Sequence, residues 1–193
     1  MGSTQRIKTG CNGSCSTFCA TPTSGNFGVQ VRMNMEIEIC KAEQEDVAGI
    51  AEIVRELGWF DQITAEPPAE TRVHIANELK LCQADDSHSV YVARAAGEAV
   101  LGYVSVHWLP YLIHTGPDGY ISELFIRDSA RGQGIGARLL ETVEAEGIRR
   151  GSRRLMLLNM RQRESYQRGF YSKLGWEERL QAATFVKNLG NEQ

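Results

Sequence analysis

The chain has 193 residues, a formal net charge of −3 and 42% hydrophobic residues. This length and composition are typical of one globular domain and argue against two. No apolar run approaches the ~20 residues that span a bilayer, and no secretory signal pattern is found near Met1. We therefore expect a cytoplasmic protein without a membrane partner.

Charge is unevenly distributed along the chain. Residues 36–126 contain 16 acidic and 5 basic side chains, whereas residues 127–193 contain 8 acidic and 13 basic ones. An imbalance of this kind informs about binding partners rather than about the fold. The second part suits an anionic ligand, and the first part suits a cationic one.

The first 34 residues are rich in Gly, Ser and Thr and poor in large apolar side chains. Such a composition cannot bury enough surface to offset the entropy of ordering, so we expect a flexible N-terminal extension over 1–34 and a folded domain over 35–193. Cys11, Cys15 and Cys19 lie in the extension without a nearby histidine. That spacing is not a common zinc motif, and no metal site is predicted.

From Glu36 onward the hydrophobic pattern becomes regular. The predicted elements are strand 36–40, helix 44–57, helix 70–81, strand 89–94, strand 99–109, strand 119–126, helix 135–150, strand 153–159, helix 164–174 and strand 184–189. Residues 95–98 are predicted to form a tight turn between two strands. Tyr166, Phe170 and Leu174 should form one apolar stripe on the helix over 164–174.

This order of elements predicts an α+β fold with a single central sheet of mixed but mostly antiparallel strands. Helices should cover both faces of the sheet. Because a helix connects the strands at 119–126 and 153–159, these two strands should be parallel.

The segment Arg131-Gly132-Gln133-Gly134-Ile135-Gly136 follows a predicted strand and opens a predicted helix. Free backbone N–H groups at a helix N-terminus, together with the helix dipole, favour negative charge. Glycine allows the backbone to approach a phosphate closely, and Arg131 adds a cation. The turn therefore predicts an anion site.

Residues 132–137 also satisfy a loose dinucleotide-binding pattern. That pattern requires an acidic residue about 20 positions on, at the end of the next strand. Here Leu155–Asn159 is followed by Met160-Arg161, without an acid, so the sequence argues against a dinucleotide site.

The sequence also argues against a nucleic-acid partner, because few aromatic residues interleave the arginines between Arg149 and Arg168 and the whole chain is acidic.

Three segments together resemble the GNAT superfamily of acyl-CoA N-acyltransferases. They are Ile121-Ser122-Glu123-Leu124-Phe125-Ile126, the glycine turn with its Arg131-x-x-Gly134-x-Gly136 pattern, and Phe170-Tyr171-Ser172-Lys173-Leu174-Gly175-Trp176. The resemblance covers about residues 36–189. It implies that the strands before and after the helix of residues 135–150 splay apart and that an acetyl-CoA co-substrate lies between them.

The resemblance also implies roles for individual residues. Backbone groups of Leu124, Phe125 and Ile126 would bind the pantetheine arm, Asn159 would contact that arm, and Tyr171 would donate a proton to the leaving thiolate. The pyrophosphate would be held by the amides of Arg131, Gly132, Gln133, Gly134, Ile135 and Gly136. One position departs from the family: Glu164 stands where many members have an asparagine seven residues before the tyrosine, which puts one cofactor contact in doubt.

Acyl transfer to an amine needs a base, because a free alkylammonium has a pKa near ~10. Glu123 is the candidate base; alternatively, it is a structural carboxylate on a face of the sheet. Tyr171 is the candidate acid; alternatively, it only packs as an aromatic side chain. A backbone N–H between Leu124 and Ile126 would stabilise the oxyanion. The acidic part of the chain favours a cationic small-molecule amine as acceptor. A protein or peptide amine and a non-catalytic acyl-CoA sensor are the alternatives, and we expect a homodimer.

Overall fold

The computed structural model describes residues 36–95 and 99–189. The strands are β1 (Ile37–Lys41), β2 (His88–Ala95), β3 (Val100–Leu109), β4 (Asp118–Ile126) and β5 (Leu155–Leu157). The helices are α1 (Val47–Leu57), α2 (Asp61–Ala65), α3 (Pro68–Cys82), α4 (Ile135–Arg149), α5 (Glu164–Gln167) and α6 (Phe170–Lys173), with short 3-10 turns at Gln44–Asp46 and Asp128–Ala130. The predicted N-terminal extension, its three cysteines and residues 96–98 of the predicted turn lie outside the described residues.

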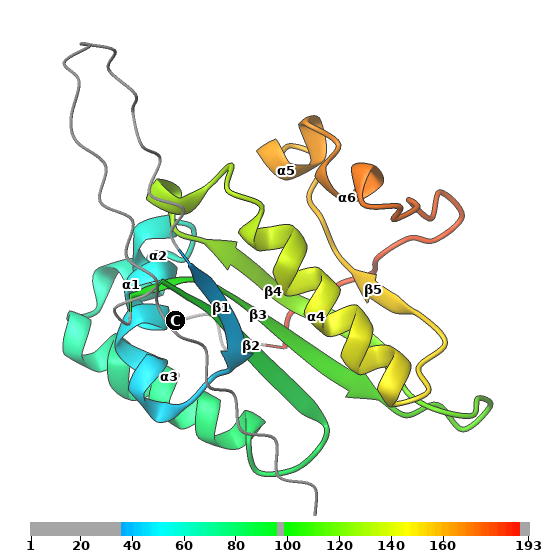
Figure 1. The fold of residues 1–193 in the computed structure, drawn as a ribbon, viewed down its shortest axis with the longest axis horizontal. Coiled ribbons are helices and arrows are strands. Elements are labelled where there is room, and N and C mark those ends of the chain that lie inside the picture. Colours follow the sequence, from blue (N-terminus) through cyan, green and yellow to red (C-terminus); the bar gives the residue numbers. More distant parts are fainter. Residues whose placement is uncertain (1–35, 96–98, 190–193) are drawn as a thin grey trace, which may run out of the picture. The chain divides into compact units, whose positions relative to one another are not determined.

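The five strands form one sheet in the order β1-β2-β3-β4-β5 (Figure 1). Neighbouring strands are antiparallel from β1 to β4, whereas β4 and β5 are parallel. The connection between these two parallel strands contains α4, as the strand–helix–strand pattern of the sequence predicted. The α+β class and the mixed sheet are therefore confirmed.

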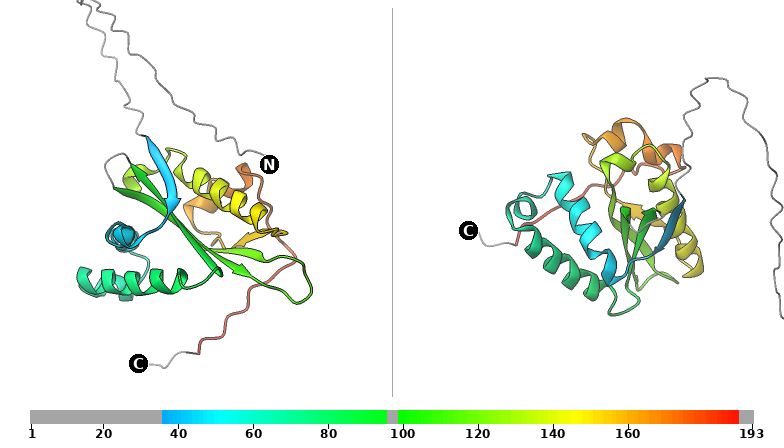
Figure 2. Two further views of the ribbon diagram at one scale, coloured as in Figure 1. Left: turned by 60° about the horizontal axis from the view of Figure 1, so that its bottom comes forward. Right: turned by 60° about the vertical axis from the view of Figure 1, so that its left-hand side comes forward.

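Helices cover both faces of the sheet (Figure 2). On one face α4 packs through Leu139, Leu140 and Val143, all fully buried, against a core that includes Val104 and Val106. On the other face α1 and α3 contribute a second core, which includes Ile50, Ile53, Leu79 and Tyr103. Alternating side chains of a strand point to opposite faces, so β3 contributes to both cores.

The β4–β5 pair separates towards the C-terminal end of β4. Its pairing extends only from Gly119 opposite Leu155 to Ile121 opposite Leu157, while β4 continues to Ile126. One edge of β4 is therefore not paired with β5 from Ser122 onward. This leaves backbone hydrogen-bonding groups of Leu124 and its neighbours facing the space between the two strands.

The structure corrects two predicted elements. The single helix predicted over 164–174 is divided into α5 and α6 at Gly169, whose φ of 62° places it in the left-handed region and ends the first helix. Tyr166, Phe170 and Leu174 therefore do not share one helical stripe. The strand predicted over Thr184–Leu189 is not formed, because these residues are exposed and have no strand partner within 36–95 and 99–189.

Smaller differences concern boundaries and a short helix. The strand predicted over 153–159 is shorter, and α2 lies between the helices predicted over 44–57 and 70–81, where no element was predicted. No helix in the described part of the chain has the length and apolar character needed to cross a membrane.

Candidate functional site

The turn before α4 presents unpaired backbone donors. Gly132 and Gly134 have φ angles of 75° and 78°, in the left-handed region that favours glycine, and both border open space. The amides of Gly132, Gln133 and Gly134 have no hydrogen-bond partner among the described residues. The Arg131 amide donates instead to the Asp128 carbonyl oxygen, 3.3 Å away. The free donors therefore begin one residue later than the sequence pattern implied.

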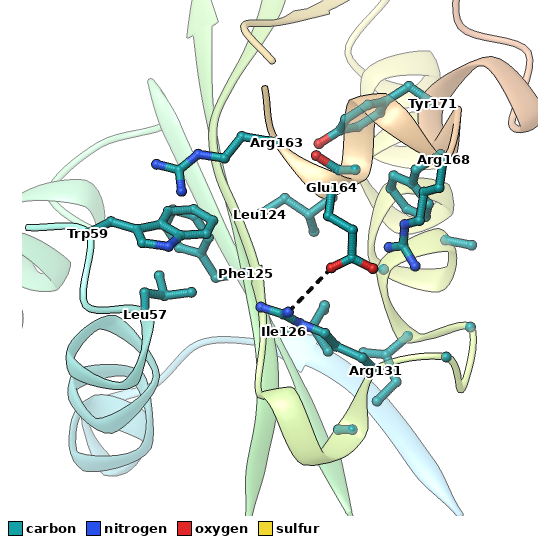
Figure 3. A pocket seen from close by; sticks show the side chains of 18 residues that line it. Leu57, Trp59, Leu124, Phe125, Ile126, Arg131, Arg163, Glu164, Arg168 and Tyr171 are labelled. Atoms are coloured by element: carbon teal, nitrogen blue, oxygen red, sulfur yellow. Dashed lines mark ion pairs between the residues drawn. The ribbon is translucent and has the colours of Figure 1, made fainter. Parts of the chain in front are cut away.

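A cavity of about 240 Å³ extends from this turn along the end of β4 towards α5 and α6 (Figure 3). Its walls come from the end of α1, from β4, from the turn, and from α5 and α6. The lining residues are Leu57, Trp59, Leu124, Phe125, Ile126, Ala130, Arg131, Gly132, Gly134, Ile135, Gly136, Ala137, Arg163, Glu164, Ser165, Arg168, Phe170 and Tyr171. The structure thus brings the β4 segment, the glycine turn and Tyr171 around one cavity.

Charged side chains surround the glycine end of the cavity. The Arg131 guanidinium is 2.7 Å from an Asp128 carboxylate oxygen. It is also 3.8 Å from a Glu164 carboxylate oxygen, the ion pair drawn in Figure 3. Arg168 also lines the cavity, whereas Arg161 is directed to Glu178 at 2.6 Å. Free amides, left-handed glycines and two arginines fit a pyrophosphate, since a Cβ at Gly132 or Gly134 would enter the space that such a group needs.

Aromatic side chains form the opposite wall. The guanidinium carbon of Arg163 lies 3.4 Å from the Trp59 ring centroid, and the Trp59 ring meets the Phe125 ring edge-on at 5.6 Å. Trp59 follows α1 and Arg163 precedes α5, so the stack joins the two sides of the cavity (Figure 3). Trp59 is 41% exposed, so this cation–π contact contributes about 0.5–1 kcal/mol, and both of its residues line the cavity.

Tyr171 lies in the wall formed by α6. Its ring contacts Phe170 and Trp176, with centroid separations of 4.9 Å and 6.1 Å. Burial raises the pKa of the Tyr171 hydroxyl above its ordinary value, and the nearby Arg168 guanidinium opposes part of that rise. The phenol is therefore protonated at neutral pH and is able to donate a proton into the cavity.

Glu123 is adjacent to the cavity but does not line it. β4 has a β-bulge at Ser122. Ser105 of β3 pairs with Glu123 and Val106 pairs with Ile121, so Ser122 between them has no partner on β3. The carboxyl group lies near the buried Tyr103 hydroxyl, on the sheet face covered by α1 and α3. Although part of the side chain reaches solvent, the surrounding protein raises the pKa of Glu123, and the Tyr103 hydroxyl opposes that rise.

Two of the remaining predicted residues are also outside the cavity lining. The Gln133 amide has no hydrogen-bond partner among the described residues, but Gln133 is not among the lining residues. Asn159 lies two residues beyond β5, where its Oδ1 accepts a hydrogen bond from the Ser165 hydroxyl at 3.0 Å. Ser165 itself lines the cavity. Sequence reasoning missed Leu57 and Ser165, since neither belongs to a motif. Within the described ranges, no group of three or more His, Cys, Asp or Glu side chains is placed to hold a metal ion.

Comparison with known families is consistent with this geometry. A sequence model of the Acetyltransferase (GNAT) family matches residues 51–176. Because the match spans more than half of the chain, the protein belongs to the GNAT acetyltransferase family. The search of curated proteins found no significant match.

Solved structures share the fold at low sequence identity. A transcriptional regulator from Bacillus halodurans C-125 is 22% identical with a TM-score of 0.69, covering 80% of this chain and 100% of that one. An aminoglycoside N-acetyltransferase in complex with CoA is 16% identical with a TM-score of 0.64, covering 81% and 98%. Glucosamine-6-phosphate N-acetyltransferase from Arabidopsis thaliana is 17% identical with a TM-score of 0.63, covering 80% and 99%. These likenesses show the fold and leave the acceptor open.

Proposed function

We propose that residues 35–193 form an N-acetyltransferase domain that transfers the acetyl group of acetyl-CoA to a primary amine of a cationic small molecule. One observation carries the proposal: the free amides of Gly132, Gln133 and Gly134 lie at one end of a cavity that continues along the unpaired edge of β4. A pyrophosphate at the turn and an extended arm along β4 match these two features in chemistry and in order.

In this proposal the chain binds the donor at three places. The turn from Arg131 to Gly136 holds the pyrophosphate, with Arg131 and Arg168 as additional cations. Backbone groups of Leu124, Phe125 and Ile126 hydrogen-bond the pantetheine arm, because this part of β4 has an edge that β5 does not pair. Asn159 contacts the arm from the other strand.

The chemical step needs a base, an oxyanion donor and an acid. Glu123 removes a proton from the acceptor ammonium, a backbone N–H of the Leu124–Ile126 segment stabilises the developing oxyanion, and Tyr171 protonates the departing thiolate. The position of Glu123 on β4, directly before the Leu124–Ile126 segment, supports its assignment as the base. Tyr171 is protonated at neutral pH, as a proton donor must be, and its ring lies in the wall of the cavity.

The Trp59–Arg163 contact favours a small acceptor over a peptide. This contact joins the two sides of the cavity and so narrows the opening through which an acceptor would enter. An extended peptide would need an open groove instead. A thiol-release assay with acetyl-CoA and a panel of amines tests the proposal. Turnover with a small cationic amine supports it, peptide-only turnover selects the protein or peptide alternative, and donor binding without any turnover selects the sensor.

The proton-accepting role of Glu123 predicts a distinctive pH dependence. A base must be deprotonated, and burial raises the pKa of this carboxyl group, so kcat/KM should fall with decreasing pH from a point above the ordinary carboxyl range. Glu123→Gln should lower kcat/KM and abolish this acidic limb. Glu141→Gln, an exposed substitution on α4, serves as the control and should keep the wild-type profile. An unchanged limb in Glu123→Gln would remove Glu123 from the mechanism.

Glu164 places a carboxylate beside the proposed phosphate site. A pyrophosphate next to Arg131 would meet like charge there, so Glu164→Gln should strengthen CoA binding, by about fivefold at low salt and less at high salt. Calorimetric titration with CoA measures the effect, again with Glu141→Gln as the control. Weaker binding by the Glu164→Gln variant would mean that the carboxylate accepts a hydrogen bond from the donor instead.

A further inference from the structure

Four aromatic side chains form a cluster between the segment that follows α1 and the strands β3 and β4. The Phe125 ring of β4 is at its centre, and three rings meet it edge-on. Their centroid separations from Phe125 are 5.6 Å for Trp59, 5.7 Å for Tyr103 and 6.3 Å for Phe60. Trp59 and Phe125 line the cavity, and Trp59 is 41% exposed. The cluster therefore presents an accessible indole at the cavity wall.

The Arg163 guanidinium lies on this indole and is held there by the ring alone. Its central carbon is 3.4 Å from the Trp59 ring centroid (Figure 3). Among residues 36–95 and 99–189, no oxygen atom accepts a hydrogen bond or an ion pair from this guanidinium, whereas Arg161 is paired with Glu178. A guanidinium has five donors, and a ring face satisfies none of them fully. A second cation can therefore replace Arg163 at little cost.

The candidate base Glu123 lies on the same sheet face as this cluster. Phe125 pairs with Tyr103 and Glu123 pairs with Ser105, so both β4 residues point to one face, roughly 7 Å apart along the strand. The Glu123 carboxyl group is also near the Tyr103 hydroxyl. Trp59 adjoins Phe125, so a small molecule whose amine is at Glu123 reaches the indole with its other end.

The surroundings of Trp59 favour a cation there over a neutral group. The chain itself places a guanidinium on the ring, which shows that the indole face is open to a cation of that size. Asp61 and Glu66 lie in the same segment as Trp59, and neither forms an ion pair within the described ranges. Their carboxylates add a negative potential that attracts cations.

We propose that the Trp59 ring, backed by Phe125, is a binding site for a second cationic group of the acceptor, and that Arg163 occupies this cation site until the acceptor displaces it. The acceptor class is then a primary amine that carries another ammonium or guanidinium group roughly 7–12 Å away. The inference rests on the proposed function, because Glu123 marks the position of the amine that is acetylated.

Calorimetric titration of the full chain in excess CoA tests the cation site without any need for turnover. The probes are aminopentyl-trimethylammonium and a neutral analogue with a tert-butyl group in place of the trimethylammonium group. They share their size and their primary amine and differ in the charge of the remote end. The wild type should bind the cationic probe about fivefold more tightly. Trp59→Leu should remove this preference, and Trp59→Phe should keep part of it, because a phenyl face attracts cations less than an indole face.

Removing the competing guanidinium should have the opposite effect. Arg163→Gln should raise the affinity for the cationic probe by about threefold and leave that for the neutral analogue unchanged, because the ring is then free. Arg161→Gln is the matched control, since Arg161 pairs with Glu178 at 2.6 Å and is not among the lining residues. It should change neither affinity. An Arg163→Gln variant with unchanged or weaker binding of the cationic probe would overturn the proposal.

Rates with acetyl-CoA separate this inference from the proposed function. Turnover of a simple alkyl monoamine, together with equal affinity for the two probes or no binding of either, would overturn the cation site and leave the proposed function standing. Preference for the cationic probe without turnover of any amine would support the cation site and contradict the proposed function. An equal loss of affinity for both probes in Trp59→Leu would show that the ring only packs, and would overturn the inference.

Discussion

Replacing Gly134 with glutamate is expected to abolish binding of CoA. Gly134 is the N-terminal cap of α4, has a φ of 78° and borders open space in the cavity. A glutamate side chain would fill the space that the pyrophosphate needs and would place a like charge in it. It would also disturb about three charge-assisted hydrogen bonds at roughly 1.5–3 kcal/mol each, which corresponds to a loss of affinity of about 1000-fold or more. Calorimetric titration with CoA should therefore detect no heat of binding.

The control for this variant must reproduce its backbone strain. Gly151→Glu does so, because Gly151 also has a left-handed φ of 68° and open space around it, and it lies outside the cavity lining. Both variants should lose similar stability, about 1–2 kcal/mol, since a side chain disfavours the left-handed region. Only Gly134→Glu should lose CoA binding. Retained affinity in that variant would show that the turn does not hold the phosphates.

Replacing Tyr171 with phenylalanine should lower turnover by about 100-fold and leave donor affinity almost unchanged. The substitution removes the hydroxyl proton that the departing thiolate needs but keeps the ring that packs against Phe170 and Trp176. Burial keeps the phenol protonated beyond its ordinary pKa near 10, so the wild-type rate should not decline through loss of this proton at moderately alkaline pH.

Steady-state rates and CoA titrations of the same preparations separate catalysis from binding at this residue. Tyr166→Phe is a suitable control, because its hydroxyl donates to Glu178 at the exposed surface, 2.9 Å away, and is not part of the cavity. That variant should keep wild-type turnover. If Tyr171→Phe also turned over at the wild-type rate, Tyr171 would be a packing residue only.

The elements that the sequence predicts well are those whose pattern depends on local neighbours. The helical spacing from Val47 to Leu57 indicates which side faces the core, and α1 buries Val47, Ile50, Ile53 and Val54 as that spacing predicts. The strands predicted over 89–94 and 99–109 are also found, as β2 and β3, and β3 is buried on both of its faces. The glycine turn is equally predictable, because its conformation depends on its own glycines, which adopt left-handed backbone angles before a helix, and not on distant residues. The parallel pair followed from the connection through α4.

What the sequence could not predict depends on the absence or geometry of distant partners. Thr184–Leu189 has the composition of a strand, but a strand needs a neighbour to pair with, and the part of the chain that the structure describes supplies none. The division of the predicted helix 164–174 at Gly169 could not be predicted, because an isolated glycine is often tolerated inside a helix. The Trp59–Arg163 contact joins residues about 100 positions apart, and no local pattern links them.

The candidate site shows the same division between local and distant information. The motif residues at the turn, on β4 and at Tyr171 do converge on one cavity, because each belongs to a local pattern at an element boundary. The side chains of Glu123 and Asn159 lie beside the cavity rather than in it. Their placement depends on the bulge opposite Ser105 and on the course of the chain after β5, neither of which spacing reveals.

Comparing CoA with pantetheine in calorimetric titrations of the wild-type protein tests the central claim most directly. Pantetheine keeps the arm and the thiol but lacks both the pyrophosphate and the 3′-phosphoadenosine group, so 4′-phosphopantetheine, which restores one phosphate at the turn, is titrated beside it and should recover part of the CoA affinity. We predict measurable binding of CoA and none of pantetheine at the same concentrations. Equal affinity for both ligands, or no heat with CoA, would contradict the claim that the amides of Gly132 to Gly134 hold the donor.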